Sequence, residues 1–276
     1  MESDRGSEIG SHYGRGRVLE SILDGLRASG KDLARLEPAD LAPVDAFHVR
    51  GREATIELAD RASLGPGMRV LDAGSGLGGS ARFLAAQYGC RVSGVDLTRE
   101  FVEVADRLTA MVRLQDRVDF RVGSVLEVPF ADGSFNVVWT EHVQMNIADK
   151  RGFYRELARV LAPGGQLLFH DIFQGANRPL HFPVPWAEEP SISFLATPEE
   201  VRGFLSEAGF TAVEWADRTR QSLEWVLASV ERGRQAGPSP LGPHLLMGET
   251  AKTKLGNAIR NLQEERMVVA QAVAGR

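Results

Sequence analysis

The sequence is poor in several features that point to particular classes of protein. Its 276 residues include one cysteine, Cys90, which excludes an internal disulfide framework and a cysteine-rich metal site. No run approaches the roughly 20 apolar residues that cross a bilayer. The first 16 residues are polar and glycine-rich rather than a cationic start followed by an apolar stretch. We therefore expect a cytoplasmic protein without membrane insertion.

An excess of positive charge is also lacking. Lys and Arg number 32 against 37 Asp and Glu, for a formal net charge of -5. Because nucleic-acid binding relies on a basic surface that neutralises phosphates, we expect no nucleic-acid partner. With 43% hydrophobic and 25% charged residues, the chain has the composition of a globular protein that can bury a substantial core. No pattern in it predicts an oligomeric state.

Short apolar runs alternate with patterns of helical period, which indicates parallel strands joined by helices. The first five runs are read as apolar rather than strictly alternating, as expected when helices cover both faces of a sheet. Thr197, Pro198 and Glu200 predict the start of a later helix, with Thr197 as N-cap and Glu200 completing a capping box. The expected strands are 69–73, 91–96, 118–122, 136–140, 166–171, 211–216 and 267–273.

A glycine-rich stretch, 74–79, lies between the first expected strand and the helix after it. Glycines at this point let the backbone turn sharply and approach a ligand closely. Gly74, Gly76 and Gly79, followed about 20 residues later by Asp96, match the fingerprint of dinucleotide-binding proteins. Taken alone, the stretch is therefore also compatible with an NAD-dependent oxidoreductase.

Asp72, just before this stretch, helps to decide whether the stretch binds NAD or S-adenosylmethionine. A carboxylate is costly to bury unless it is paired or hydrogen-bonded. Loop amides or the cationic end of a cofactor would supply a partner, whereas a pyrophosphate would be repelled. S-adenosylmethionine carries a sulfonium and an ammonium but no phosphate, so Asp72 favours it. The alternative is that Asp72 merely ties down the loop.

Four motifs in order between residues 66 and 171 resemble those of class I S-adenosylmethionine-dependent methyltransferases. They are 70–79, 94–98, 126–135 and 159–165. The sequence is closer to small-molecule methyltransferases of the sarcosine/dimethylglycine and natural-product group, through 139–146 and, less specifically, 183–186. The resemblance implies an α/β, Rossmann-like methyltransferase fold with a mostly parallel seven-stranded sheet, helices on both faces and a helical lid.

Three segments lie outside the strand–helix alternation, and we expect them to complete one methyltransferase domain over 1–276. Residues 11–62 would form an N-terminal helical lid on a cofactor-binding core, 63–173. The loop 174–196, rich in proline and aromatic residues, would lie on the substrate side. The C-terminal part, 197–276, contains a helical insertion, 220–262, interrupted by glycines and prolines.

The resemblance also implies roles for residues around the cofactor. Gly74 and Gly76 would line its methionine and ribose portions, Asp96 would bind the ribose hydroxyls, and Leu97 would pack on the adenine. The family usually has Gly-Asp after the third strand; Ser124 here is a weaker hydrogen-bond acceptor than a carboxylate. The predicted cofactor-binding residues are Asp72, Gly74, Ser75, Gly76, Asp96, Leu97, Ser124 and Val125.

Glu141 and His142, which follow the fourth expected strand, are the candidates for catalysis. Methyl transfer is an in-line displacement that depends on positioning, and a base is needed only if the nucleophile arrives protonated. His142 is the first candidate because its ordinary pKa lies near neutrality; the alternative is a structural histidine. Glu141 would contact the cofactor or orient its neighbour. His170 is expected to be structural.

Other candidates depend on how the outer segments fold. His48 and Tyr13 can reach the cofactor if 11–62 fold over it, and Trp186 and Trp225 can line a pocket. If the acceptor is a diphosphate, the arginines that bind it are expected among Arg15, Arg17 and Arg50. A solvated helix face is expected to carry Lys150, Arg151 and Arg155.

The sequence thus predicts S-adenosylmethionine-dependent methylation of a small molecule at nitrogen, carbon or oxygen. Two classes of acceptor stay open: an amine such as a glycine derivative, and a natural product such as an isoprenoid diphosphate. The alternatives are an NAD-dependent oxidoreductase and a non-catalytic adenosylmethionine-binding protein, for which Ser124 is the one hint.

Overall fold

Seven strands form a single sheet in the computed structural model, which describes residues 17–276 except 238 and 249. The strands are β1 (Arg69–Ala73), β2 (Arg91–Asp96), β3 (Val118–Val122), β4 (Phe135–Glu141), β5 (Leu161–Gln174), β6 (Thr211–Asp217) and β7 (Met267–Gly275). They lie in the order β3-β2-β1-β4-β5-β7-β6. Pairs from β3 to β5 are parallel, and β7 is antiparallel to both β5 and β6. The predicted mostly parallel, seven-stranded sheet is confirmed.

The strand boundaries differ most from expectation at β5. The Pro-Gly-Gly stretch, Pro163 to Gly165, predicts the end of a helix and a turn into a strand at residue 166. The strand instead begins at Leu161, ahead of this stretch, and continues to Gln174. Leu161 pairs with Phe135, and after a shift of register Gln166 pairs with Val137. The Pro-Gly-Gly stretch therefore forms an irregularity within the strand rather than a turn before it.

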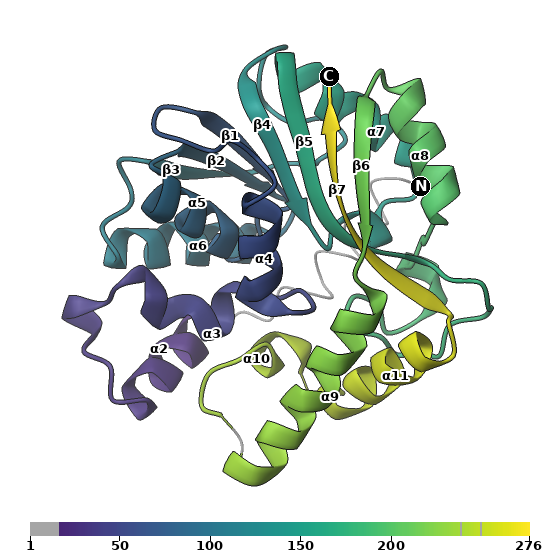
Figure 1. Ribbon diagram of the computed structural model, residues 1–276. Helices are drawn as coiled ribbons and strands as arrows, with labels where there is room; N and C mark the ends of the chain where they lie inside the picture. Colours follow the sequence, from purple (N-terminus) through teal and green to yellow (C-terminus); the bar gives the residue numbers. More distant parts are fainter. Residues whose placement is uncertain (1–16, 238, 249) are drawn as a thin grey trace.

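Helices cover both faces of the sheet (Figure 1). On one face α4 (Gly51–Ala59), α5 (Gly79–Tyr88) and α6 (Arg99–Met111) pack on β1 to β3, burying Val70 and Val92. On the other, α7 (Lys150–Val160) and α8 (Pro198–Glu207) pack around Leu71 and Phe169. The predicted capping box of α8 is present, since Thr197 Oγ1 accepts from the Glu200 amide and the Glu200 carboxylate accepts from the Thr197 amide.

The outer segments gather below the sheet in Figure 1. They include α2 (Val18–Ala28), α3 (Ala42–Asp45), α9 (Thr219–Ala236), α10 (His244–Met247) and α11 (Ala251–Gln263), with the short 3-10 turns η1 (Leu33–Arg35) and η2 (Pro38–Leu41). Leu26 of α2 and Leu241 belong to one buried cluster. A Cβ at Gly25 would lie 2.5 Å from the Pro240 carbonyl oxygen. Helix α2 therefore packs closely against the segment between α9 and α10.

The loop 174–196 also has a core of its own. Trp186 and Val184 are buried with Ile172 of β5 and Met267 of β7, and η4 (Pro190–Ile192) follows. Among the residues that the structure describes, no helix is both long and apolar enough to cross a membrane.

Candidate active site

A pocket of about 270 Å³ lies where the glycine loop and the ends of the parallel strands meet the outer segments. Its walls come from 44–49, the loops after β1 to β4, β5 and residues 185–186, and from the C-terminal helices. All ten predicted site residues line it: Asp72, Gly74, Ser75, Gly76, Asp96, Leu97, Ser124, Val125, Glu141 and His142.

The glycine loop has the left-handed backbone that its sequence predicts. Gly74 has φ +79° and Gly76 φ +52°, a region that favours glycine. A Cβ at Gly74 would overlap Val143, whereas a Cβ at Gly76 would meet nothing within 4 Å. Gly74 is therefore required by packing, while Gly76 leaves open space beside the loop, where a ligand can approach the backbone.

Asp96 links this loop to the end of β2. Its carboxylate accepts from the amides of Gly76 and Thr98, each at 2.8 Å. The next residue, Leu97, is 41% exposed although it lines the pocket. An apolar side chain left open beside a fixed carboxylate offers a surface for a flat ring.

Ser124 uses its hydroxyl oxygen within its own turn. Ser124 Oγ accepts from the Leu126 amide at 3.1 Å, the arrangement of a short side-chain turn. Its hydroxyl proton remains available to a ligand acceptor, and Val125 forms the buried side of the same wall.

Asp72 is buried, and its Oδ2 atom has no hydrogen-bond partner in the described structure. Burial raises the pKa of Asp72 to about 8, and the nearby carboxylates of Glu141 and Asp96 add to the rise. An uncompensated carboxyl facing a pocket is suited to a cationic ligand. This is the partner that the sequence predicts for it.

The raised pKa of Asp72 leads to a measurable coupling between cofactor and protons. At pH 7 the carboxyl is mostly protonated, and a cation placed against it favours ionisation. Binding of S-adenosylmethionine at pH 7 is therefore expected to release close to one proton. Calorimetry in buffers of different ionisation enthalpy measures this release, which Asp72→Asn should remove. A binding enthalpy independent of the buffer would contradict the assignment.

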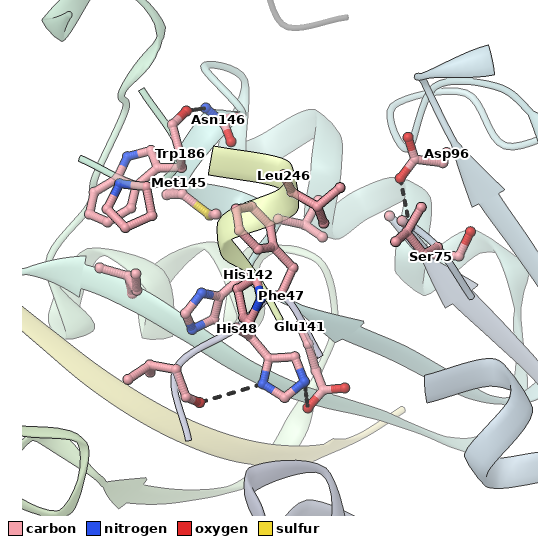
Figure 2. Close-up of a pocket in the computed structure, with 18 of the residues that line it drawn as sticks. Phe47, His48, Ser75, Asp96, Glu141, His142, Met145, Asn146, Trp186 and Leu246 are labelled. Carbon is pink, nitrogen blue, oxygen red and sulfur yellow. Dashed lines mark hydrogen bonds and ion pairs between the residues drawn. The ribbon is translucent and has the colours of Figure 1, made fainter. Parts of the chain in front are cut away.

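Glu141 is surrounded by donors from three elements. Its carboxylate accepts from Trp139 Nε1 at 2.9 Å, Ser80 Oγ at 2.5 Å and Thr55 Oγ1 at 3.1 Å. His48 Nε2 lies 3.5 Å from Glu141 Oε1 (Figure 2). Glu141 thus ties α4, α5 and the N-terminal segment to the end of β4. The sequence motifs do not identify these partners, which come from distant parts of the chain.

His48, His142 and His170 form a cluster at the pocket, with ring centroids 5.2 to 5.8 Å apart; His48 and His142 line the pocket. His142 has φ +54°, an uncommon conformation for a residue with a side chain and one that recurs at functional sites. Its Nε2 atom is buried and has no hydrogen-bond partner among the described residues. Burial, reinforced by His170 and His48, holds the pKa of His142 well below 6.5. The ring is therefore neutral at pH 7.

His170 occupies the structural position expected for it. It is buried in β5, and its Nε2 donates to the Val49 carbonyl at 3.0 Å. Burial, followed by His48, lowers the pKa of His170 to about 4. His48 itself lines the pocket, as expected if the N-terminal segment folds over it. Tyr13 and Arg15 lie outside the described residues.

Two of the arginines considered for a diphosphate do not reach the pocket. Arg17 is exposed and lies 3.7 Å from Glu20. Arg50 forms a two-pronged ion pair with Glu57 at 2.5 and 2.8 Å. Because its charge is already paired, the expectation of a phosphate-binding role for Arg50 is not supported. Trp186 and Trp225 do line the pocket.

The prediction that Lys150 lies on a solvated helix face is wrong. Lys150 is buried rather than solvated, and its ammonium donates to the carbonyls of Gln144 and Phe194, both at 2.6 Å, and of Ile147. Burial lowers its pKa to about 8. Lys150 therefore holds the 3-10 turn η3 (Gln144–Asn146) against the substrate-side loop. Arg151, in contrast, is exposed and pairs with Glu207.

The sheet order and the glycine loop at the carboxyl end of β1 define an α/β fold that binds its ligand beyond the strand ends. Residues 71–169 match the family model described as "Methyltransferase domain". This match extends over the core of the sheet, from β1 to β5, and agrees with the resemblance to methyltransferases that the motifs indicate. Solved structures that share the fold contain S-adenosylmethionine or S-adenosylhomocysteine, in agreement with the predicted cofactor.

Proteins of similar sequence or fold also carry the name methyltransferase. Sarcosine/dimethylglycine N-methyltransferase of Halorhodospira halochloris is 32% identical over 158 residues, 57% of each protein. Methyltransferase GfsG of Streptomyces halstedii is 35% identical over 166 residues, 60% of this chain and 58% of the relative. The chain thus matches little more than half of each relative. Geranyl diphosphate C-methyltransferase of Streptomyces coelicolor A3(2) shares the fold, with TM-score 0.71, 18% identity and coverage of 99% of this chain and 98% of that one.

Proposed function

We propose that this protein transfers a methyl group from S-adenosylmethionine to a small-molecule acceptor. The observation that carries the proposal is a single pocket that joins the acidic glycine loop to a chamber built by the outer segments. A cofactor at one end and an acceptor at the other would then meet beside His142 and Glu141. In this proposal 11–62 act as the lid, and 174–196 and 220–262 supply the substrate side.

The residues at the loop fit S-adenosylmethionine. Gly76 leaves open space beside the backbone, Leu97 offers an apolar surface for adenine, and the free Oδ2 of Asp72 suits a cationic group. Asp96, fixed by two amides, would bind the ribose hydroxyls. Ser124 and Val125 would border the adenine.

When bound, S-adenosylmethionine supplies an electrophilic methyl group: the acceptor's nucleophilic atom bonds to the methyl carbon, the carbon–sulfur bond breaks, and its electron pair stays on sulfur in S-adenosylhomocysteine. The protein positions the acceptor in line, which by itself gives a large part of the rate. For a protonated nucleophile, the proton passes to a neutral base. His142 is in that state at pH 7 and lines the pocket.

Replacing His142 by asparagine tests this role. We expect S-adenosylmethionine affinity to be unchanged and turnover of a protonated acceptor to fall by about 100-fold or more. Because the pKa of His142 lies below 6.5, the wild-type rate should stay constant as pH falls through 6.5 and decline only at lower pH. His181→Asn, at a histidine paired with Glu264 outside the pocket, is the control. Unchanged turnover of the His142 variant would refute its role as base.

The proposed activity is tested by S-adenosylhomocysteine formation with a panel of amines, phenols and prenyl diphosphates. Turnover with any of them supports methyl transfer. Binding of the cofactor without turnover across the panel would favour a non-catalytic adenosylmethionine-binding protein. Binding of NAD in its place would favour the oxidoreductase alternative. Roles in natural-product biosynthesis and a cytoplasmic location stay predictions from the sequence.

A further inference from the structure

The half of the pocket away from the glycine loop has an apolar wall. Figure 2 shows Asp96 and Ser75 at one side of the view, Trp186 and Met145 at the other, and His48, His142 and Glu141 between them. Six segments that are separate in the chain contribute to this wall. Their side chains include Ile172, Trp186, Trp225, Leu246, Leu255 and Met267.

The polar groups near this wall are engaged by the protein itself. Trp186 Nε1 donates to Ser193 Oγ at 2.9 Å, so the indole presents its ring to the pocket. The amide nitrogen of Asn146 donates to the carbonyls of Trp186 and Ile192 at 3.0 and 2.8 Å (Figure 2 shows the first of these). These hydrogen bonds fix the wall and leave its aromatic surface as the main contact for an acceptor.

The ionisable side chains that line the pocket, apart from its histidines, are all carboxyl groups. They are the carboxyls of Asp45, Asp72, Asp96 and Glu141, and no lysine or arginine is found among the described lining residues. Asp45 forms an ion pair with Arg82, which does not line the pocket; Arg82 Nη2 lies 2.5 Å from Asp45 Oδ1. An acceptor bearing a phosphate or carboxylate would lose its hydration here without meeting a lysine or arginine among the described lining residues, and it would lie near the carboxyl group of Glu141.

We infer that the acceptor is an uncharged, largely apolar molecule whose single nucleophilic group points towards the histidines. This inference rests on the proposed function and names the substrate class of the same pocket. It sets this pocket apart from two groups of acceptors that the sequence left open, glycine derivatives and isoprenoid diphosphates. Each carries an anionic group that this lining does not balance.

Two fluorescent probes that share one ring system test the inference without turnover. N-phenyl-1-naphthylamine is uncharged, and 8-anilinonaphthalene-1-sulfonate adds one sulfonate; both brighten in apolar surroundings. With S-adenosylhomocysteine present, we expect the uncharged probe to bind about tenfold more tightly or better, because the sulfonate must be desolvated beside carboxylates. Equal or tighter binding of the sulfonate, or no binding of the uncharged probe, would overturn the inference.

A matched pair of variants on α11 locates the effect. Leu255 lines the pocket, whereas Thr253, two residues earlier on the helix, is exposed and does not. Leu255→Arg should weaken binding of the uncharged probe and strengthen binding of the sulfonate probe. The ratio of the two affinities should shift by about tenfold or more. Thr253→Arg adds the same charge outside the pocket and should leave the ratio unchanged. Equal shifts in both variants, or in neither, would place the probe elsewhere and overturn the inference.

The two proposals fail in distinguishable ways. Probe binding with the predicted preference but no cofactor binding would refute methyl transfer and keep the apolar pocket. Methylation of phosphoethanolamine or geranyl diphosphate in preference to uncharged phenols would keep methyl transfer and overturn the acceptor class.

Discussion

Gly76→Asn is expected to reduce S-adenosylmethionine affinity by about 100-fold or more while the fold persists. Gly76 has φ +52°, a conformation that asparagine tolerates better than other residues with a side chain. A Cβ there meets no atom of the described residues within 4 Å. The new side chain would therefore not strain the packing. It would occupy the space beside the loop that the proposal assigns to the cofactor.

Gly67→Asn is the matched control for this variant. Gly67 also has positive φ, +83°, and a Cβ there likewise meets nothing within 4 Å, but it lies outside the pocket. Both variants should lose at most about 1 kcal/mol of stability, and only Gly76→Asn should lose cofactor binding. Calorimetric titration and denaturant unfolding measure the two quantities. Retained affinity in Gly76→Asn would contradict the placement of the cofactor.

Asp45→Ala should destabilise the protein by about 3–5 kcal/mol, the usual cost of leaving one member of a buried ion pair unpaired. Arg82 is fully buried in α5, and its Nη2 lies 2.5 Å from Asp45 Oδ1. Its Nη1 donates to Thr109 Oγ1 at 3.1 Å, while its Nε has no partner in the described structure. Removal of Asp45 therefore leaves a buried cation without its counter-charge.

The contact between Asp45 and α5 also attaches the N-terminal segment to the end of the glycine loop. A Cβ at Gly79 would overlap the Asp45 carbonyl, so the two backbones lie in direct contact. Asp24→Ala, which removes an exposed pairing with Arg27, is the control and should change stability by no more than about 0.5 kcal/mol. Unfolding in urea measures both variants. A loss below about 1 kcal/mol for Asp45→Ala would show that the pair does not hold the segment in place.

The parts of the fold that could be predicted are those with local sequence signals. Apolar runs marked all seven strands, and Thr197 with Glu200 marked the start of α8, because these patterns reflect contacts between near neighbours in the chain. The glycine loop was recognisable for the same reason. The start of β5 was wrong because Leu161 pairs with Phe135 on the neighbouring strand, a contact that the Pro-Gly-Gly turn signal does not encode.

The candidate site was predictable along the strand ends but not across the pocket. All ten proposed residues line it, since the topology brings the carboxyl ends of parallel strands together. The contacts of Glu141 with Thr55 and His48 depend on how the N-terminal segment folds back, which no local pattern gives. Lys150 was expected in solvent for a similar reason: a charged residue at a helix start looks exposed until a distant loop covers it.

Direct titration of the wild-type protein with S-adenosylmethionine and with NAD tests the central claim most directly. We expect saturable, one-to-one binding of S-adenosylmethionine and no detectable binding of NAD under the same conditions. Binding of NAD without S-adenosylmethionine would contradict the assignment of the glycine loop and the methyl-transfer function built on it.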